Sequence, residues 1–155
     1  MEHEEYMRQA LELARQAMAE GEVPVGCVIV RDGAVVGRGR NRRETAQTAL
    51  GHAELEAIAQ ACRTLGGWRL AGCALYVTLE PCPMCAGAIV NARIPAVYYG
   101  AKDDKAGCCG SVLNLFEERF NHHPRLYRGP LERECQEILQ DFFQGLREDG
   151  AGENG

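Results

Sequence analysis

The chain has 155 residues, of which 46% are hydrophobic and 25% are charged, a composition that is ordinary for one soluble globular domain. No apolar run reaches the roughly 18 residues that a membrane helix needs, which argues against a membrane protein. The acidic start over residues 1–5 is unlike a secretion signal, so we expect a cytoplasmic protein.

The formal net charge of −5 argues weakly against a nucleic-acid partner, but the charge is unevenly distributed. Residues 1–22 hold six acids and two bases (−4), and residues 131–155 hold seven acids and two bases (−5). Residues 23–130 hold thirteen bases and nine acids (+4), so a locally positive face can still bind phosphates. The arginines at positions 38–43 are candidates for such contacts, the alternative being a solvated strand end.

The chain contains eight cysteines, which we expect to be reduced in a protein without a secretion signal. We interpret Cys27, Cys62, Cys73 and Cys135 as small buried apolar residues.

Hydrophobic periodicity and turn residues predict an α/β fold. The expected elements in chain order are a helix over 3–20, strands over 25–30 and 34–38 joined at Asp32-Gly33, a helix over 52–65, a strand over 74–79, a helix over 82–92, strands over 96–100 and 125–128, and a helix over 131–147 with Leu131, Cys135, Ile138, Phe142 and Leu146 inward. A helix joins the strands over 74–79 and 96–100, so these two strands should be parallel. Residues 1–147 are expected to form a single domain, and residues 148–155 a disordered tail.

A Pro-Cys-Pro-Met-Cys segment over 81–85 follows a buried strand and opens a helix. Cys82 and Cys85 are three residues apart, so they share one face of a first helical turn. The positive end of the helix dipole lowers thiol pKa values there and favours thiolates, which are metal ligands. The two cysteines therefore predict one half of a zinc site.

The segment His52-Ala53-Glu54 supplies the other half, since a catalytic zinc site keeps three protein ligands and one open position. Residues two apart in a helix point about 200° away from each other, so His52 and Glu54 can face one site only if the helix begins there. Glu54 would then act as the base that takes a proton from water and passes it to the substrate. The alternative is a structural zinc site with a fourth protein ligand, for which the candidates are Cys108, Cys109, His122 and His123.

This pair of motifs resembles the signature of zinc-dependent nucleobase deaminases. The wider sequence resembles the bacterial tRNA adenosine deaminase family of the cytidine/deoxycytidylate deaminase superfamily over nearly all of residues 5–147. The similar stretches are residues 21–26, Asn41, 52–54, 68–70, 75–88, 107–111, 119–122 and 141–143. The resemblance implies a three-layer αβα cytidine-deaminase-like fold, with a central mixed five-stranded sheet flanked by helices. It also implies one Zn²⁺ per subunit and a homodimer with RNA contacts from both subunits.

The implied activity is the hydrolytic conversion of adenosine to inosine at the wobble position of an arginine tRNA anticodon. By resemblance, His52, Cys82 and Cys85 would bind the metal, and Glu54 would be catalytic. The residues that would contact the RNA are Val25, Asn41, Ala53, Asp103, Lys105, Asn121, His122 and Phe143. Extruding a base from a single-stranded loop costs less than opening a duplex.

Several of these residues have plainer interpretations, and the function has two alternatives. Asn41 is a common turn residue, Asp103 can cap its own loop, His122 can be a simple loop residue, and Phe143 can pack in the core. A guanine, cytosine or nucleoside deaminase would share the zinc chemistry. An inactive zinc-stabilised RNA-binding subunit is the third possibility, against which the presence of Glu54 argues.

Overall fold

The computed structural model describes residues 2–148. Within them the elements are α1 (Glu2–Ala19), β1 (Gly26–Arg31), β2 (Ala34–Arg40), α2 (Ala53–Leu65), β3 (Cys73–Leu79), α3 (Pro83–Asn91), β4 (Ala96–Ala101), a 3₁₀ turn (Leu115–Glu117), β5 (Arg125–Arg128) and α4 (Glu132–Glu148). Every predicted helix and strand is present, with boundaries that differ by at most two residues. None of the described helices is both long and apolar enough to cross a membrane.

The strands form one mixed sheet in the order β2-β1-β3-β4-β5. Strand β1 is antiparallel to both β2 and β3, whereas β3, β4 and β5 run parallel. Helix α3 connects β3 to β4, as the crossover between parallel strands requires. The predicted mixed five-stranded sheet is therefore confirmed.

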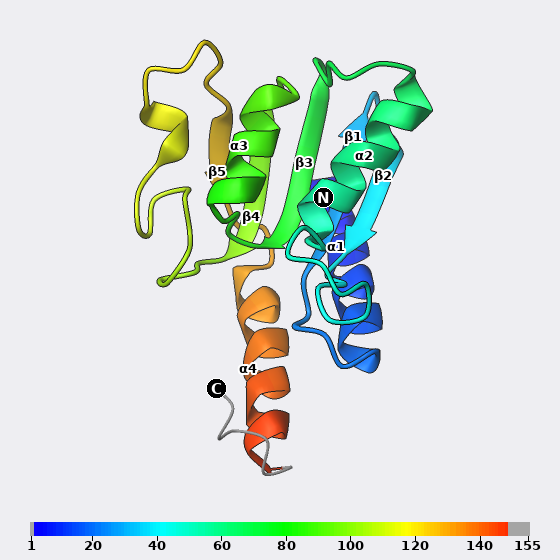
Figure 1. Cartoon of the computed structure of the whole chain (residues 1–155), viewed down its shortest axis with the longest axis vertical. Helices are drawn as coiled ribbons and strands as arrows, with labels where there is room; N and C mark the ends of the chain where they lie inside the picture. The colour runs from blue at the N-terminus through cyan, green and yellow to red at the C-terminus, as the bar shows by residue number, and fades with distance from the viewer. Residues whose placement is uncertain (1, 149–155) are drawn as a thin grey trace.

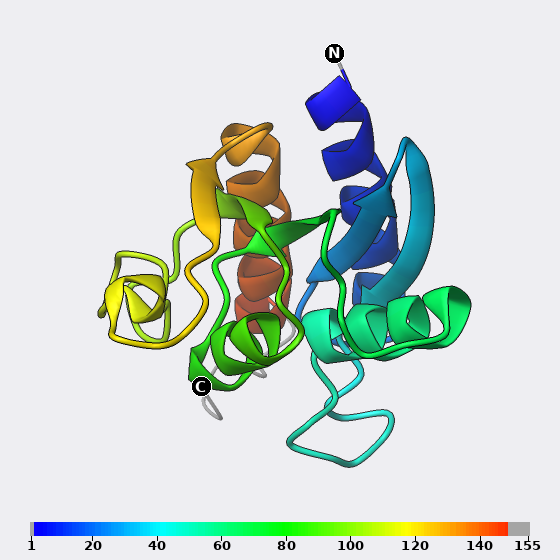
Figure 2. The same cartoon turned by 90° about the horizontal axis from the view of Figure 1, so that it is seen from above.

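Helices cover both faces of the sheet, so the fold has three layers (Figures 1 and 2). On one face, alanines of α2 and apolar residues of α3 pack on alternate side chains of β1, β3 and β4. On the other face, α1 and the first turns of α4 cover the intervening side chains of the same strands. The predicted αβα architecture is confirmed.

Glycines in β2 set how closely α2 approaches the sheet. A Cβ atom at Gly39 would overlap the main-chain oxygen of Ala53, and one at Gly37 would overlap that of Ala57. The helix therefore lies directly on the strand backbone. Because α2 begins beside His52, this close packing also sets the position of the proposed metal ligand.

We expect the substitution Gly39→Ala to lower the free energy of unfolding by about 1–3 kcal/mol, because the added methyl group must push the strand and α2 apart. Chemical denaturation measures the change. The control is Gly87→Ala inside α3, where a Cβ meets no other atom within 4 Å. That substitution should be neutral or stabilise the protein by up to about 1 kcal/mol, because alanine is the better helix former. An equal decrease in the free energy of unfolding in both variants would contradict the close packing of α2 on β2.

Helix α4 is buried only at its start. Cys135 and Ile138 are buried, whereas the more distal Phe142 and Leu146 are only half-buried. The reason is visible in Figure 1, where α4 continues past the ends of the strands, so its last turns have little to pack against. The helix includes Glu148, and residues 149–155 of the predicted tail lie outside the described part of the chain.

Candidate active site

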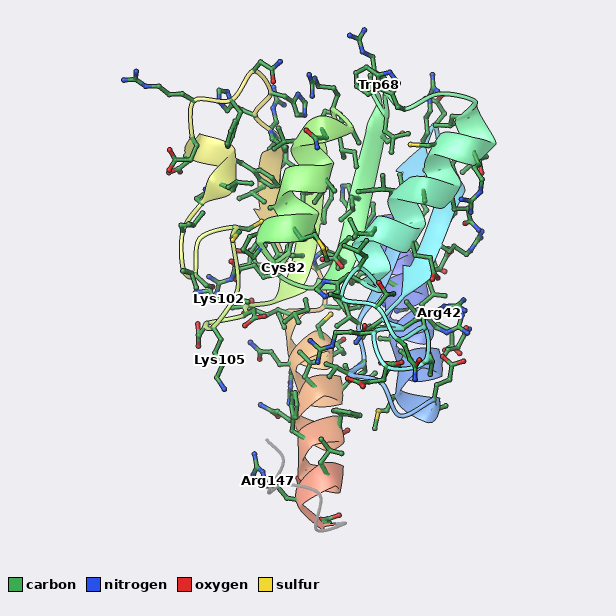
Figure 3. All side chains as sticks on the ribbon, viewed as in Figure 1. Arg42, Trp68, Cys82, Lys102, Lys105 and Arg147 are labelled. Atoms are coloured by element: carbon green, nitrogen blue, oxygen red, sulfur yellow. The ribbon has the colours of Figure 1, made fainter. Side chains whose placement is uncertain are left out.

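A pocket of about 210 Å³ lies where β3 and β4 end and where α2 and α3 begin. It lies at the same end of the sheet as the labelled Cys82, Lys102 and Lys105, opposite the end that carries Trp68 (Figure 3). Its walls come from five separate segments of the chain. The lining residues are Val23, Val25, Asn41, Arg43, His52, Ala53, Glu54, Leu79, Glu80, Cys82, Asp103 and Ala106.

His52, Cys82 and Cys85 converge at this pocket. The Nδ1 atom of His52 lies 3.6 Å from Sγ of Cys82 and 3.4 Å from Sγ of Cys85. The three ligand atoms all lie within 4.8 Å of one another. Zinc–sulfur and zinc–nitrogen bonds at a tetrahedral angle place N and S about 3.6 Å apart. The donor set and its spacing therefore fit one tetrahedral metal ion.

Two helix N-termini bring these ligands together. His52 is the N-cap of α2 and Cys82 is the N-cap of α3. Pro83 occupies the first turn of α3, where a missing N–H group costs little. Both helix dipoles therefore direct their positive ends toward the thiolates, as expected for an anionic ligand set.

Hydrogen bonds among His52, Cys82 and Cys85 shift the pKa values of all three side chains. The Cys85 thiol donates to Cys82 and lowers the pKa of Cys82 to about 4, and His52 acts in the same direction. The same bond, together with burial, raises the pKa of Cys85. The hydrogen bond to Cys82 raises the pKa of His52. When the two sulfur atoms share a proton, the negative charge therefore lies on Cys82, whereas a bound zinc ion would take both as thiolates.

Glu54 lies in the first turn of α2 and is only 4% exposed. Its carboxyl group lines the same pocket as His52, because the helix begins at residue 53 and both side chains can face its N-terminal end. Burial raises the pKa of Glu54 to about 7. A carboxyl group in this position can both accept and donate a proton near neutral pH.

Within the described residues, the candidates for a fourth protein ligand do not join the His–Cys–Cys cluster. The Cys108 thiol donates to the main-chain oxygen of Ala106. The Nε2 atoms of His122 and His123 bond the main-chain oxygens of Ile94 and Glu118. The geometry thus favours three protein ligands and an open position, the arrangement of a catalytic site.

Three of the proposed substrate-binding residues, Val25, Ala53 and Asn41, line the pocket. The Asn41 side chain is also part of a turn. Its Nδ2 donates to the main-chain oxygen of Val23, and its Oδ1 accepts from Arg43 N–H. Asn41 is therefore a turn residue by its hydrogen bonds within the chain, and it also lines the pocket.

Asp103 lines the pocket as well, and it also caps its own loop. Its Oδ1 accepts hydrogen bonds from the main-chain N–H groups of Lys105 and Ala106. Lys105 is exposed and does not line the pocket, but Figure 3 shows it with Lys102 on the neighbouring loop.

The structure does not bring Asn121, His122 or Phe143 into the pocket. Asn121 and His122 precede β5, so they lie at the opposite end of the parallel strands, where His122 bonds Ile94. Phe143 is 43% exposed on α4 and is therefore not a core residue.

Sequence reasoning assigned no role to Glu80, which lines the pocket, or to Glu22, which lies next to the lining residue Val23. Glu22 is 1% exposed and accepts from the N–H groups of Glu44 and Thr45. Burial opposes ionisation of Glu80, but hydrogen bonds from Ser111 and nearby main-chain groups keep its pKa below the ordinary value. An acidic residue between a buried strand and the candidate metal ligand Cys82 was the available signal for Glu80.

The arginine segment at 38–43 is largely engaged within the protein. Arg40 pairs with Glu20 at 2.9 Å, and Arg42 pairs with Glu56 at 3.0 Å. Arg43 lines the pocket and is more exposed, with a longer contact of 3.7 Å to Glu44. Arg43 is therefore the arginine of this segment best placed to meet a substrate phosphate.

Comparison with known proteins agrees with this geometry. Residues 1–147 match the MafB19-like deaminase family. The chain is 51% identical over 143 residues to a tRNA-specific adenosine deaminase of Bacillus subtilis, covering 92% of this chain and 89% of that protein.

Two solved structures are also similar. One, from a study of A-to-I editing by tRNA:A34 deaminases at the wobble position, has a TM-score of 0.84 and 47% identity, covering 87% of this chain and 99% of that one. The other, a guanine deaminase of Bacillus subtilis, has a TM-score of 0.64 and 35% identity, covering 96% and 95%. The chain is therefore a deaminase of the MafB19-like group and belongs to the family of the tRNA-specific adenosine deaminases.

Proposed function

We propose that this protein is a zinc-dependent hydrolase that converts adenosine to inosine at the wobble position of an arginine tRNA anticodon. The observation that carries the proposal is the convergence of the His52–Cys82–Cys85 cluster and the buried carboxyl group of Glu54 on one pocket. Membership of the tRNA-specific adenosine deaminase family supports tRNA as the substrate class. The metal chemistry supports a reducing compartment, so we place the activity in the cytoplasm.

His52, Cys82 and Cys85 would hold the zinc ion through Nδ1 and the two Sγ atoms. When bound, zinc supplies a Lewis acid that makes a water molecule easier to deprotonate. Val25, Ala53 and Asn41 form the pocket walls and would hold the flipped base. Because the pocket is enclosed on these sides, the base must leave its RNA stack to enter.

Glu54 would move the protons of the reaction. Hydrolytic deamination adds water at C6 of adenine and releases ammonia, so a proton must leave the water and protons must reach the base and the departing amine. Glu54 is the acid side chain of the pocket that extends from the same helix start as His52. One carboxyl group can take the first proton and deliver it to the substrate.

The direct test is to incubate the zinc-loaded protein with arginine tRNA and sequence the wobble base. Inosine pairs as guanosine, so an A-to-G change at that position is the expected result. Other tRNAs with a wobble adenosine serve as the comparison for tRNA identity. Unchanged arginine tRNA in the presence of zinc-loaded protein would contradict the proposal.

Guanine deamination is the second candidate, because the chain is 35% identical to a guanine deaminase over nearly its full length. The higher sequence identity and TM-score of the tRNA:A34 deaminase structure favour tRNA over guanine as the substrate. Ammonia release from free guanine, cytosine and adenosine distinguishes the candidates. Faster turnover of guanine than of tRNA would favour the second one.

A homodimer is part of the proposal and accounts for two of the RNA-contact residues that lie outside the pocket. Asn121 and His122 lie at the far end of the sheet from the pocket, so they would reach RNA bound there only from the partner subunit. The exposed Val112 and Leu113 offer apolar surface in the loop next to the pocket. We expect light scattering to give twice the mass of one chain, and a monomer at working concentration would contradict this.

Binding of the anticodon loop is expected to weaken with salt despite the net charge of −5. If Arg43, Lys102 and Lys105 contact phosphates of a single-stranded loop, the logarithm of affinity should fall with the logarithm of salt with a slope of about −2. The substitution Lys105→Gln should make that slope shallower by about 0.7, whereas Arg8→Gln on α1 should not change it. A flat affinity between low and physiological salt would rule out these contacts.

A further inference from the structure

Glu80 lines the pocket, and its buried carboxylate accepts hydrogen bonds from a single loop. Its side chain is 2% exposed and belongs to the segment between β3 and Cys82. Oε1 accepts from Asp103 N–H at 3.1 Å and from the Ser111 hydroxyl. Oε2 accepts from the N–H groups of Cys109 at 2.9 Å and Ser111 at 3.1 Å. All four donors belong to the loop after β4.

The main chain around Glu80 is bonded to the same region. Glu80 N–H donates to the oxygen of Ala101, and Cys108 N–H donates to the oxygen of Pro81, both at 2.8 Å. Gly107 lies directly on the carboxylate, so that a Cβ atom there would overlap it. The loop therefore packs closely around this one acidic side chain, two residues before the proposed metal ligand Cys82.

This loop forms part of the pocket wall. Asp103 and Ala106 line the pocket. The Asp103 carboxylate is in turn held by the N–H groups of Lys105 and Ala106. The position of these pocket residues therefore depends on how the loop is held.

We propose that Glu80 is a positioning residue for the RNA substrate, holding residues 101–111 so that Asp103 and Ala106 meet the nucleotides around the target base. The proposal rests on the proposed function, because that function supplies the RNA substrate. Its structural part, the restraint of the loop, does not depend on the identity of that substrate.

Glu22 provides a matched comparison on the other side of the pocket. It is 1% exposed, and it accepts from Glu44 N–H at 3.1 Å and Thr45 N–H at 2.6 Å. It therefore restrains the loop that follows β2, and it makes none of the bonds that hold residues 101–111.

The variant Glu80→Gln keeps the side-chain volume and removes a defined contact. If the amide oxygen takes the Oε2 position, it still accepts from Cys109 and Ser111, and the NH₂ group can donate to the Ser111 hydroxyl. The N–H group of Asp103 then faces a donor and loses its partner. Hydrogen exchange should accelerate in residues 101–111 and stay unchanged in 41–51, whereas Glu22→Gln should show the reverse.

With the zinc-loaded protein and an anticodon stem-loop RNA, Glu80→Gln should raise KM about tenfold, because the partly buried N–H group of Asp103 loses its partner and the loop is less often in the position that meets the substrate. It should change kcat by less than about twofold, because Glu54 and the metal ligands are untouched. The exposed Glu117→Gln is the control for loss of one negative charge.

Unchanged KM and unchanged exchange in residues 101–111 would overturn the proposal. Loss of zinc, or a fall in kcat as large as the rise in KM, would also overturn it, since Glu80 would then support the metal centre. If wild-type protein does not act on the RNA while Glu80→Gln still accelerates exchange in 101–111, the proposed function fails and the restraint of the loop stands.

Discussion

The substitution Glu54→Ala is expected to abolish deamination while zinc content and RNA binding stay close to wild type. A single general acid–base group commonly contributes on the order of 10²–10⁴ in rate, and Glu54 is expected to move more than one proton in each turnover. The rate should therefore fall by at least about 10³-fold. Single-turnover kinetics with an excess of enzyme over stem-loop RNA measure this step without a contribution from product release.

Two further variants make the interpretation specific. Because Glu54 is buried, alanine leaves a cavity, so Glu54→Gln tests the loss of proton transfer at nearly constant volume. Glu56, two residues further along α2, pairs with Arg42 and does not line the pocket, so Glu56→Gln is the control. Retention of half of the wild-type rate by Glu54→Ala would contradict the assignment of the proton shuttle.

The substitutions Cys82→Ser and Cys85→Ser are each expected to remove the metal and, with it, the activity. Zinc binds thiolate strongly, whereas a serine hydroxyl is not ionised at neutral pH and is a poor replacement. Elemental analysis should give about one zinc ion per wild-type chain and less than about 0.1 per chain in either variant. Elemental analysis that finds no metal in active wild-type protein would rule out the zinc site altogether.

Other cysteines in the chain supply controls matched for burial. Cys62 is half-buried like Cys82, and Cys73 is buried like Cys85, yet neither belongs to the metal cluster. Their serine variants should keep the metal. Because binding to the folded state alone stabilises a protein, a chelator should lower the Tm of wild type and of these controls. It should have no effect on the Tm of Cys82→Ser or Cys85→Ser.

The local pattern of the chain was sufficient to predict its helices and strands and the pair of cysteines in the candidate metal site. The apolar run before Pro81, the proline-rich helix start and the spacing of Cys82 and Cys85 depend on neighbouring residues only, so they can be recognised without coordinates. The argument that α2 must begin next to His52, because His52 and Glu54 are two residues apart, is also local. The structure begins α2 at Ala53.

The positions of the RNA-contact candidates could not be derived in this way. Asn121 and His122 precede a strand that runs parallel to β4, so they lie at the end of the sheet opposite the pocket. Strand order and direction, which no single segment contains, decide that placement. The sequence also could not show that Asp103 both caps its own loop and lines the pocket, since the second property depends on the tertiary structure.

The sequence by itself determined the α/β class from periodicity and the cysteine pair from short spacing, and the resemblance of the two motifs to the deaminase signature linked that pair to His52 and Glu54. Tertiary structure decided which loops surround that chemistry and what holds them. Glu80 meets Cys109 and Ser111 across 29 and 31 residues, and α2 lies against β2 only because Gly37 and Gly39 have no side chain. Such contacts depend on the fold of the whole chain. A buried carboxylate needs hydrogen-bond donors, and tertiary packing decides which residues supply them.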